Sequence, residues 1–368
     1  MTGREKWAKY LAGGEVGPMV CPLCDKWGAA EGYEWKGPDP EPFAGDESRG
    51  LFRGQIMMAR TFGWDPLFYA AIKFQPEDMS IAPVAETSIK GNKTYTSATI
   101  RTPLGNLTQI EERNGVTQRC VKKYLENERD YEMMLWYTAE MLNFRRDAAL
   151  EDGKKLREAV GDLGMIGTWV SPSVMLTDVQ TLYYDMMDYP EAFEALRAER
   201  LKLLRLQLGV YREAGFDFMF YCLPGTDTIS PGFYEEWIKA EVLENIRAWS
   251  AAGGFTLLHS CGHLKAMIEK GIHNEMLPEM METLSVPPVG NIPSLAWARE
   301  RLDPRIITKG NIPLDILLGG LADDVREAVR RVKRETAGYR HVIGLSDNIL
   351  NGTPSRNLRA FVDEGYRA

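Results

Sequence analysis

The stretch that decides the fold is Phe255-Thr-Leu-Leu-His-Ser-Cys-Gly-His263, in which an apolar run ends in imidazole, hydroxyl and thiol groups. The run from 255 to 258 favours a strand covered on both faces, and two glycines before it supply the turn. His259 and Cys261 are two residues apart, so their side chains project from the same face. Gly262 lacks a Cβ and lets the chain turn toward a helix expected over 264–270.

Imidazole and thiolate at the end of a strand suit zinc, because zinc prefers nitrogen and sulfur ligands. The carboxyl ends of strands are also where α/β folds place their chemistry. A small buried cysteine beside a hydrogen-bonded histidine would give the same pattern. The pair alone therefore predicts ligands but does not establish a site.

Outward from this stretch, apolar strands alternate with helical patterns along most of the chain. Strands are expected to begin near Pro18, Pro66, Met165, Phe216, Phe255, Thr283, Arg305 and His341. Eight such units, each followed sooner or later by a helix, predict an α/β fold of the (β/α)8 TIM barrel type, as one domain over residues 1–368. β-Branched residues and turn signals near 81–113 predict an antiparallel β insertion. An open doubly wound sheet is the alternative, although no Gly-x-Gly-x-x-Gly motif opens a helix.

Composition and charge narrow the class of protein. The chain has 368 residues, 44% of them hydrophobic, and a net charge of −8, which argues against nucleic acid as the main partner. The basic run Arg330–Arg334 follows several acidic residues and is expected to be a solvated helix face. No apolar run is long enough to span a membrane and no signal peptide is evident, so we expect a soluble, cytoplasmic protein. Five cysteines in so long a chain fit a reducing compartment.

Other cysteines and aromatic residues are candidates for the same site. Cys222 ends the strand before the His259 strand and could be a further metal ligand or a buried thiol. Trp27 and Tyr221 follow or end strands and could form a substrate wall, or could simply pack in the core. Cys120 lies in a polar, helical-looking segment and is expected to be structural. His341 begins its strand, which places it at the opposite, stabilising face of a barrel.

Four motifs together carry a family resemblance. They are His259-Ser-Cys-Gly262, Pro287-Pro-Val-Gly290, Lys309-Gly-Asn-Ile312 and the segment 352–361, which reads Gly-Thr-Pro-Ser-Arg-Asn-Leu-Arg-Ala-Phe. In their order and spacing the chain resembles the uroporphyrinogen decarboxylase superfamily and, within it, the cobalamin-dependent zinc methyltransferases. That branch includes enzymes of the methylcobalamin:coenzyme M type and corrinoid-dependent O-demethylases. The resemblance implies a (β/α)8 barrel, in agreement with the strand pattern.

The resemblance also implies a catalytic zinc site. In that branch a His-x-Cys pair and a later Cys, six residues before a Thr-Pro, hold the metal, and His259 and Cys261 match the pair. Counting back six residues from Thr353 reaches Asp347, so a carboxylate stands where the family has a thiolate. Oxygen ligands are acceptable to zinc. Either Asp347 or Cys222 would then be the third ligand.

Three functions follow as hypotheses. The first is a zinc methyltransferase of the O-demethylase type, which moves a methyl group between a small methylated substrate, expected to be a methoxylated compound that can be aromatic, and the cobalt of a partner corrinoid protein. The second is a porphyrinogen decarboxylase, which needs arginines after the first strand to bind carboxylates. The segment Cys21-Pro-Leu-Cys-Asp-Lys-Trp27 offers one Lys and no Arg there. The third is a non-catalytic, corrinoid-handling subunit.

Overall fold

The computed structural model describes residues 1–24, 30–31, 36–114 and 118–367. The chain divides into two compact units, which are considered separately. Unit 1 comprises residues 1–71, 153–172 and 212–368, and unit 2 comprises residues 72–152 and 173–211. The assignment of the whole chain to one domain stays a prediction. Among the described residues, no helix combines the length and apolarity needed to cross a membrane.

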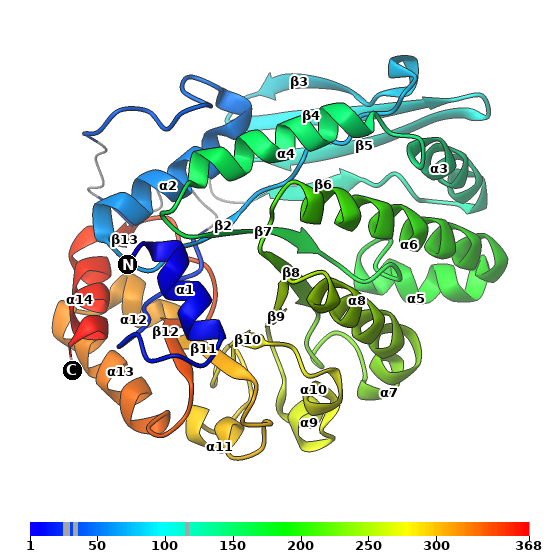
Figure 1. The fold of residues 1–368 in the computed structure, drawn as a ribbon. Helices are drawn as coiled ribbons and strands as arrows, with labels where there is room; N and C mark the ends of the chain where they lie inside the picture. The colour runs from blue at the N-terminus through cyan, green and yellow to red at the C-terminus, as the bar shows by residue number, and fades with distance from the viewer. Residues whose placement is uncertain (25–29, 32–35, 115–117, 368) are drawn as a thin grey trace. The chain divides into compact units, whose positions relative to one another are not determined.

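Unit 1 is built on a curled parallel sheet of seven strands (Figure 1), with the order β2-β7-β8-β9-β10-β11-β12. The strands are β2 (Leu67–Tyr69), β7 (Met165–Val170), β8 (Phe218–Leu223), β9 (Phe255–Ser260), β10 (Met280–Thr283), β11 (Ile307–Ile312) and β12 (His341–Leu345). All neighbouring pairs are parallel. This confirms the α/β class and six of the eight expected strands near their expected starts.

The first expected strand, near Pro18, lies beside β12 but forms no continuous ladder. Val20 and Ile343 make an isolated parallel bridge, and so do Leu23 and Asn348. On the other side, the Asp65 amide donates to the Val20 carbonyl at 2.7 Å. The segment thus bridges toward β12 and toward the residues just before β2, whereas closure into a full eight-stranded barrel is not confirmed.

The strand expected to begin at Thr283 instead ends there. Its apolar residues start at Met280, and the backbone of Thr283 and Leu284 takes positive φ angles of 75° and 51°. Such angles are incompatible with an extended strand. The strand therefore ends at Thr283, the residue at which the sequence predicted that it would begin.

Helices accompany the strands of unit 1. The helices wholly within this unit are α1 (Gly3–Leu11), α2 (Gly50–Phe62), α7 (Pro231–Phe233), α8 (Lys239–Ala251), α9 (Lys265–Glu269), α10 (Ile272–Met276), α11 (Leu295–Arg299), α12 (Leu314–Gly319), α13 (Ala322–Glu335) and α14 (Ser355–Tyr366). A short π-helical turn, Tyr234–Ile238, joins α7 to α8. A two-residue parallel pair, β1 (Ala30–Glu31) with β13 (Thr353–Pro354), lies outside the main sheet.

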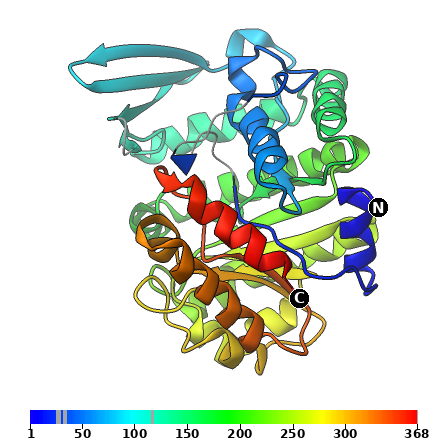
Figure 2. The same cartoon turned by 90° about the vertical axis from the view of Figure 1, so that its left-hand side faces the viewer.

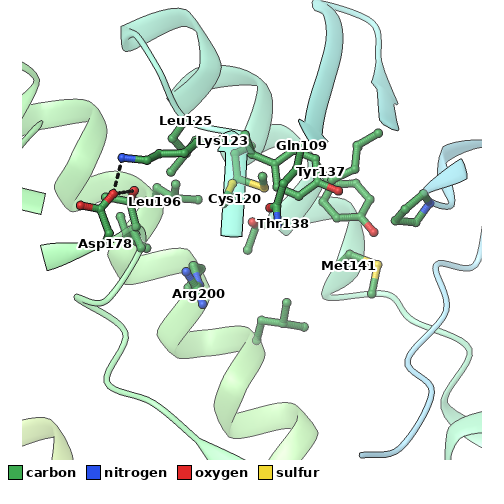
Figure 3. Close-up of a pocket in the computed structure, with 17 residues that line it drawn as sticks. Gln109, Cys120, Lys123, Leu125, Tyr137, Thr138, Met141, Asp178, Leu196 and Arg200 are labelled. Atoms are coloured by element: carbon green, nitrogen blue, oxygen red, sulfur yellow. Dashed lines mark hydrogen bonds and ion pairs between the residues drawn. The ribbon is translucent and has the colours of Figure 1, made fainter. Parts of the chain in front are cut away.

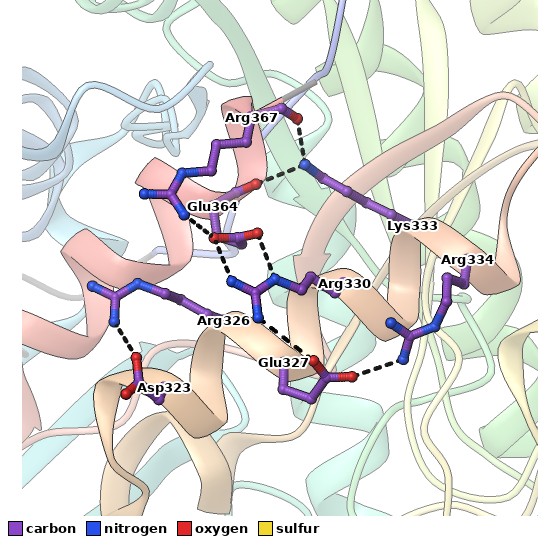
Figure 4. A network of polar contacts seen from close by, with 8 residues as sticks. All are labelled: Asp323, Arg326, Glu327, Arg330, Lys333, Arg334, Glu364 and Arg367. Atoms are coloured by element: carbon purple, nitrogen blue, oxygen red, sulfur yellow. Dashed lines mark hydrogen bonds and ion pairs between the residues drawn. The ribbon is translucent and has the colours of Figure 1, made fainter.

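The basic residues of the run 330–334 lie on α13, which is beside α14 (Figure 2), and Val332 within the run is buried. Arg330 Nε donates to Glu364 Oε1 at 2.9 Å, and Arg334 donates to Glu327 at 2.8 Å (Figure 4). The opposite face is apolar and buried, through residues such as Val325 and Val329. Amphipathic patterning accounts for this helix, and the expected solvated, charge-paired face is confirmed.

Unit 2 contains an antiparallel sheet of the order β3-β4-β5-β6. Its strands are β3 (Val84–Lys90), β4 (Lys93–Thr102), β5 (Gly105–Arg113) and β6 (Gln118–Lys122). The helices α3 (Glu128–Met141) and α5 (Val179–Asp188) belong to the same unit, and the residues of α4 (Arg146–Val160) and of α6 (Pro190–Glu213) are divided between the two units. The predicted insertion is confirmed, and it extends to Lys122.

Cys120 was expected in a helical segment, and that expectation is wrong. It lies in β6, where strand pairing with β5 overrides the helical appearance of its polar sequence, and its side chain is exposed.

Candidate active site in the curled sheet

Four side chains with polar or sulfur groups lie in one row across the sheet of unit 1. The parallel register pairs Cys222 with His259, His259 with Glu282, and Glu282 with Lys309. Two residues earlier on the same strands, the row is wholly apolar, because Phe220, Leu257, Met280 and Ile307 belong to one buried cluster. Side chains two residues apart share a face, so the polar row continues the apolar interior toward the carboxyl ends of the strands.

His259, Glu282 and Lys309 form a chain of contacts within this row. Glu282 Oε1 lies 2.6 Å from His259 Nδ1, and Glu282 Oε2 accepts a hydrogen bond from Lys309 Nζ. The side chains are buried, with Glu282 only 1% exposed and Lys309 fully buried. Burial alone would raise the pKa of Glu282, but the Lys309 charge and the His259 contact lower it below its ordinary value. Glu282 is therefore an ionised acceptor, and His259 donates through Nδ1.

The His259 ring also interacts with two of the other predicted ligands, Cys261 and Asp347. Burial alone would lower its pKa, but hydrogen bonds with Cys261 and Glu282 and the charges of Glu282 and Asp347 raise it to about 10. Asp347 follows β12, three strands away from β9 in the sheet order. Its influence on His259 follows from the curl of the sheet, which brings the ends of β9 and β12 toward each other.

Gly262 sets the direction of the chain after Cys261. Its φ is +76°, and a Cβ at this position would lie 2.3 Å from Asp227 Oδ1. That Asp227 oxygen accepts a hydrogen bond from the His263 amide at 3.0 Å. The turn thus needs glycine both for its backbone angle and for the close carboxylate, and it leaves the Cys261 side chain exposed.

The donor set of His259 and Cys261 suits zinc, because zinc prefers nitrogen and sulfur ligands. Within the described ranges, no group of three or more His, Cys, Asp or Glu side chains is arranged to hold a metal ion. His259 and Cys261 do contact each other, and Glu282 orients the ring through Nδ1 so that Nε2 is left to face a metal. A carboxylate on the second ring nitrogen is the usual support of a zinc-binding histidine. Cys222 lies on the same face and is partly buried against the apolar interior.

An aromatic wall adjoins His259, and sequence reasoning did not identify it. The Phe220 ring is centred 5.0 Å from the His259 ring and 4.4 Å from the Trp169 ring. Tyr69 completes the group, at 4.9 Å from Phe220 and 5.5 Å from Trp169. Trp169 is 42% exposed, although it sits at the end of a buried strand. The wall thus has an open side on which a flat apolar group can stack.

The two aromatic residues predicted to line the substrate have different positions. Tyr221 is fully buried on the other face of β8, where its hydroxyl lies 3.1 Å from Glu241 and accepts from Asn245 at 3.2 Å, both in α8. It therefore anchors a helix, and its assignment to the substrate wall is corrected. Trp27 lies outside the described residues.

The remaining histidines lie outside the row. His341 begins β12 as expected, with Nδ1 2.9 Å from Thr308 Oγ1 and Nε2 2.8 Å from the Gly310 carbonyl. His273 is fully buried in α10, and burial lowers its pKa to about 4. His263 follows Gly262 and is half-buried.

Comparison with known proteins gives a consistent family and fold. Residues 137–367 match the family model described as Uroporphyrinogen decarboxylase (URO-D). Among solved structures, a methyltransferase from Methanosarcina mazei is similar, with a TM-score of 0.67, 16% identity, and coverage of 99% of this chain and 98% of that chain. A B12-independent methionine synthase from Shewanella sp. W3-18-1 has a TM-score of 0.39 and 15% identity, and the match covers 59% of this chain and 65% of that chain. At these identities the likeness concerns the fold alone, and the second match adds nothing to it. No curated protein matches in sequence.

Proposed function

The chain belongs to the uroporphyrinogen decarboxylase family, and we propose that it is a zinc-dependent methyltransferase that works with a corrinoid protein. The methyl group would pass between a small methylated substrate and the cobalt of that separate partner. The observation that carries the proposal is the His259 ring, oriented by Glu282 and in contact with Cys261, beside an open aromatic wall. The likeness to a methyltransferase fold agrees with this function.

His259 and Cys261 would hold the zinc, with Asp347 or Cys222 as the third ligand. When bound, zinc would act as a Lewis acid that polarises an ether oxygen or stabilises a thiolate. Glu282 keeps the Nδ1 proton of His259 in place, and zinc would bind at Nε2 by replacing the proton there. Lys309 keeps Glu282 ionised, because its buried charge lies directly on the second carboxylate oxygen.

Substrate and direction follow from the third ligand and the wall. A carboxylate in place of a thiolate transfers less electron density to the metal and leaves it a stronger Lewis acid, which favours oxygen-bearing substrates. The rings of Trp169, Phe220 and Tyr69 offer a surface for an apolar or aromatic group. We therefore propose demethylation of a methoxylated compound, with aromatic methyl ethers as the preferred class.

Two measurements test this function. Elemental analysis of protein purified without an affinity tag should find about one zinc per chain, which is the stoichiometry of a single such site. A methoxylated aromatic compound should then convert cob(I)alamin to its methylated form, with the loss of the cob(I)alamin absorption spectrum. Cys261→Ala and Asp347→Ala should abolish this reaction, whereas Cys120→Ala, a change in unit 2, should not.

Each of the other possible outcomes would indicate a different function for this protein. Activity retained in chelator by metal-free protein would exclude the zinc mechanism. Turnover of thiols but not ethers would reverse the proposed direction, and metal without any methyl transfer would favour a corrinoid-handling subunit. Decarboxylation of a porphyrinogen would overturn the proposal. The sequence has no arginine between Arg4 and Arg49 to bind the carboxylates of such a substrate.

A further inference from the structure

Unit 2 contains a cavity that the proposed methyl transfer does not use (Figure 3). Its volume is about 530 Å³, and every lining residue lies in unit 2. Strands β4, β5 and β6 contribute one wall, α3 a second, and α6 with the segment before α5 a third. Sites for small molecules have volumes of about 300–1,000 Å³, so the cavity has the size of a ligand site.

The charged side chains of the lining give no reason to expect an ionic ligand. Lys123 forms an ion pair with Asp178 and a hydrogen bond with Thr181. Burial alone would raise the pKa of Asp178, but hydrogen bonds from Lys123 and Thr181 lower it to about 2, so both members of the pair are charged. Arg200, the third charged residue of the lining, also has an interaction partner within the chain. Since each charge is already engaged by the protein, the cavity favours a neutral ligand.

Much of the remaining lining is apolar. Met134, Met141 and Leu196 provide flexible or branched side chains, and Tyr124 and Tyr137 provide two rings. Walls of this kind bond water poorly, so an apolar ligand would gain by displacing it. The tyrosine rings also offer surfaces on which an aromatic ligand can pack.

The hydroxyl groups of the two tyrosines are available as hydrogen-bond donors. Burial raises the pKa of both, and the charge of Tyr124 would raise that of Tyr137 further. The two hydroxyls are therefore close enough to interact, and both stay protonated. Among the residues that the structure describes, neither hydroxyl has a hydrogen-bond partner, so the pair can donate to an oxygen atom of a ligand.

A third hydroxyl, that of Thr138 in α3, is an independent sign of a ligand. Thr138 lines the cavity (Figure 3) and is only 4% exposed. Within the described part of the chain its hydroxyl has no hydrogen-bond partner either. Buried polar groups are normally hydrogen-bonded, so this hydroxyl requires a partner that occupies the cavity.

The walls are held by contacts outside the cavity. The buried hydroxyl of Tyr131, in α3, donates to Asp185 Oδ2, in α5, at 2.6 Å. The Tyr131 ring also lies 6.3 Å from that of Phe193, in α6. Because these contacts fix α3, α5 and α6 to one another, the cavity is a built feature of unit 2.

We propose that this cavity binds a neutral aromatic molecule that carries an oxygen acceptor, such as a ketone or an ether. The ring system would lie against the tyrosine and methionine side chains, and the oxygen would accept hydrogen bonds from the hydroxyls of Tyr124, Tyr137 and Thr138. Cys120 lines the cavity and is exposed, so a bound ligand would cover its thiol.

A pair of neutral fluorescent probes tests the proposal on the full chain. The ketone 6-propionyl-2-(dimethylamino)naphthalene and the ketone-free 2-(dimethylamino)naphthalene share one ring system and differ in the oxygen acceptor. The ketone should bind and protect Cys120 from N-ethylmaleimide, as measured by mass spectrometry of the Cys120 peptide. Fluorescence titration of both probes then gives their affinities for wild type and variants.

Two variants remove the hydroxyls and keep the shape of the side chains. Thr138→Val, and the double variant Tyr124→Phe with Tyr137→Phe, should each weaken binding of the ketone about fivefold, as expected for one lost hydrogen bond between neutral groups. The affinity of the ketone-free probe should stay the same, which would show that the cavity itself is intact. Tyr184→Phe is the matched control, because it removes an exposed hydroxyl on α5 that does not line the cavity, and it should change neither affinity.

Three results would overturn the proposal. They are an unprotected Cys120 at saturating ketone, an unchanged affinity of the ketone in both variants, and an equal loss of affinity for the two probes. These readouts involve no methyl transfer, so they are independent of the proposed enzyme activity.

Discussion

The contact between Glu282 and Lys309 predicts a strong energetic coupling at the centre of the site. Both side chains are at most 1% exposed, and each neutralises the other. Removing Glu282 leaves the Lys309 charge without a partner, and removing Lys309 leaves Glu282 with His259 alone. Breaking a buried pair of this kind typically costs about 3–5 kcal/mol. Lys309→Met and Glu282→Gln should each show a loss of this size in metal-free protein.

The double variant should recover most of that loss. Gln at position 282 still offers an oxygen to His259 Nδ1, and Met at position 309 fills the space of the lysine stem without charge. We expect the double variant to lie within about 1.5 kcal/mol of wild type, since a buried ion pair can often be replaced by uncharged groups at little cost. The coupling energy would then be several kcal/mol.

Urea unfolding of the four proteins, followed by circular dichroism, measures this cycle. An unfolding entropy of about 2.1 cal/mol/K per residue gives about 0.8 kcal/mol/K for 368 residues. A loss of about 4 kcal/mol therefore corresponds to a Tm decrease of about 5 °C. Additive losses in the double variant would refute the reasoning, because they would mean that the two charges do not compensate each other.

Three further predictions concern the wall, a buried histidine and the turn. Trp169→Ala should raise KM about three- to tenfold for an aromatic methyl ether but not for methanol, as steady-state kinetics would show, and an equal change for both would mean that the ring does not contact substrate. His273 has a pKa lowered to about 4, so below pH 6.5 only the unfolded chain takes up the proton and stability falls, by up to about 3 kcal/mol near pH 4. His273→Leu should flatten that loss in urea unfolding at pH 7 and pH 4.5, and an unchanged slope would contradict the assignment. Gly262→Ala should be more destabilising, and should lose more zinc, than the control Gly253→Ala. Both glycines have a similar positive φ, +80° at Gly253, but a Cβ at Gly253 would have no atom closer than 3.6 Å, whereas a Cβ at Gly262 would collide with Asp227. Equal effects of the two changes would mean that only the backbone conformation matters.

The sequence was sufficient for features that depend on local pattern. The apolar run before His259 predicts β9, and Gly262 has the expected turn conformation. The antiparallel insertion is also predictable, because alternation and turn residues are local signals. Closure of the barrel depends on long-range pairing of the segment near Val20, where only isolated bridges form.

Other features depend on neighbours that the sequence does not reveal. Glu282 and Lys309 each lie in an otherwise apolar strand. In the sequence, a single charged residue at such a position looks like the end of the strand, and only the register shows that the two residues are neighbours on adjacent strands. Tyr221 lies within the aromatic strand β8, and only the side-chain alternation of the folded sheet separates its helix-facing ring from the inward-facing Phe220. Charged residues within otherwise buried strands were the available signal for this missed part of the site.

The geometry of the sheet also explains why two residues, Cys222 and Asp347, remain candidates for the third ligand of the proposed zinc site. Cys222 is on β8, directly beside His259 in the register, so it needs no closure of the sheet to lie near the pair. Asp347 follows β12, and it acts on His259 because the sheet is curled. A flat sheet would separate β9 and β12 by three strand spacings of about 4.8 Å, too far for one metal ion to join ligands from both. The curl is therefore the property that turns a local His-x-Cys motif into a candidate site with two alternative partners, a neighbouring thiol and a carboxylate from across the sheet.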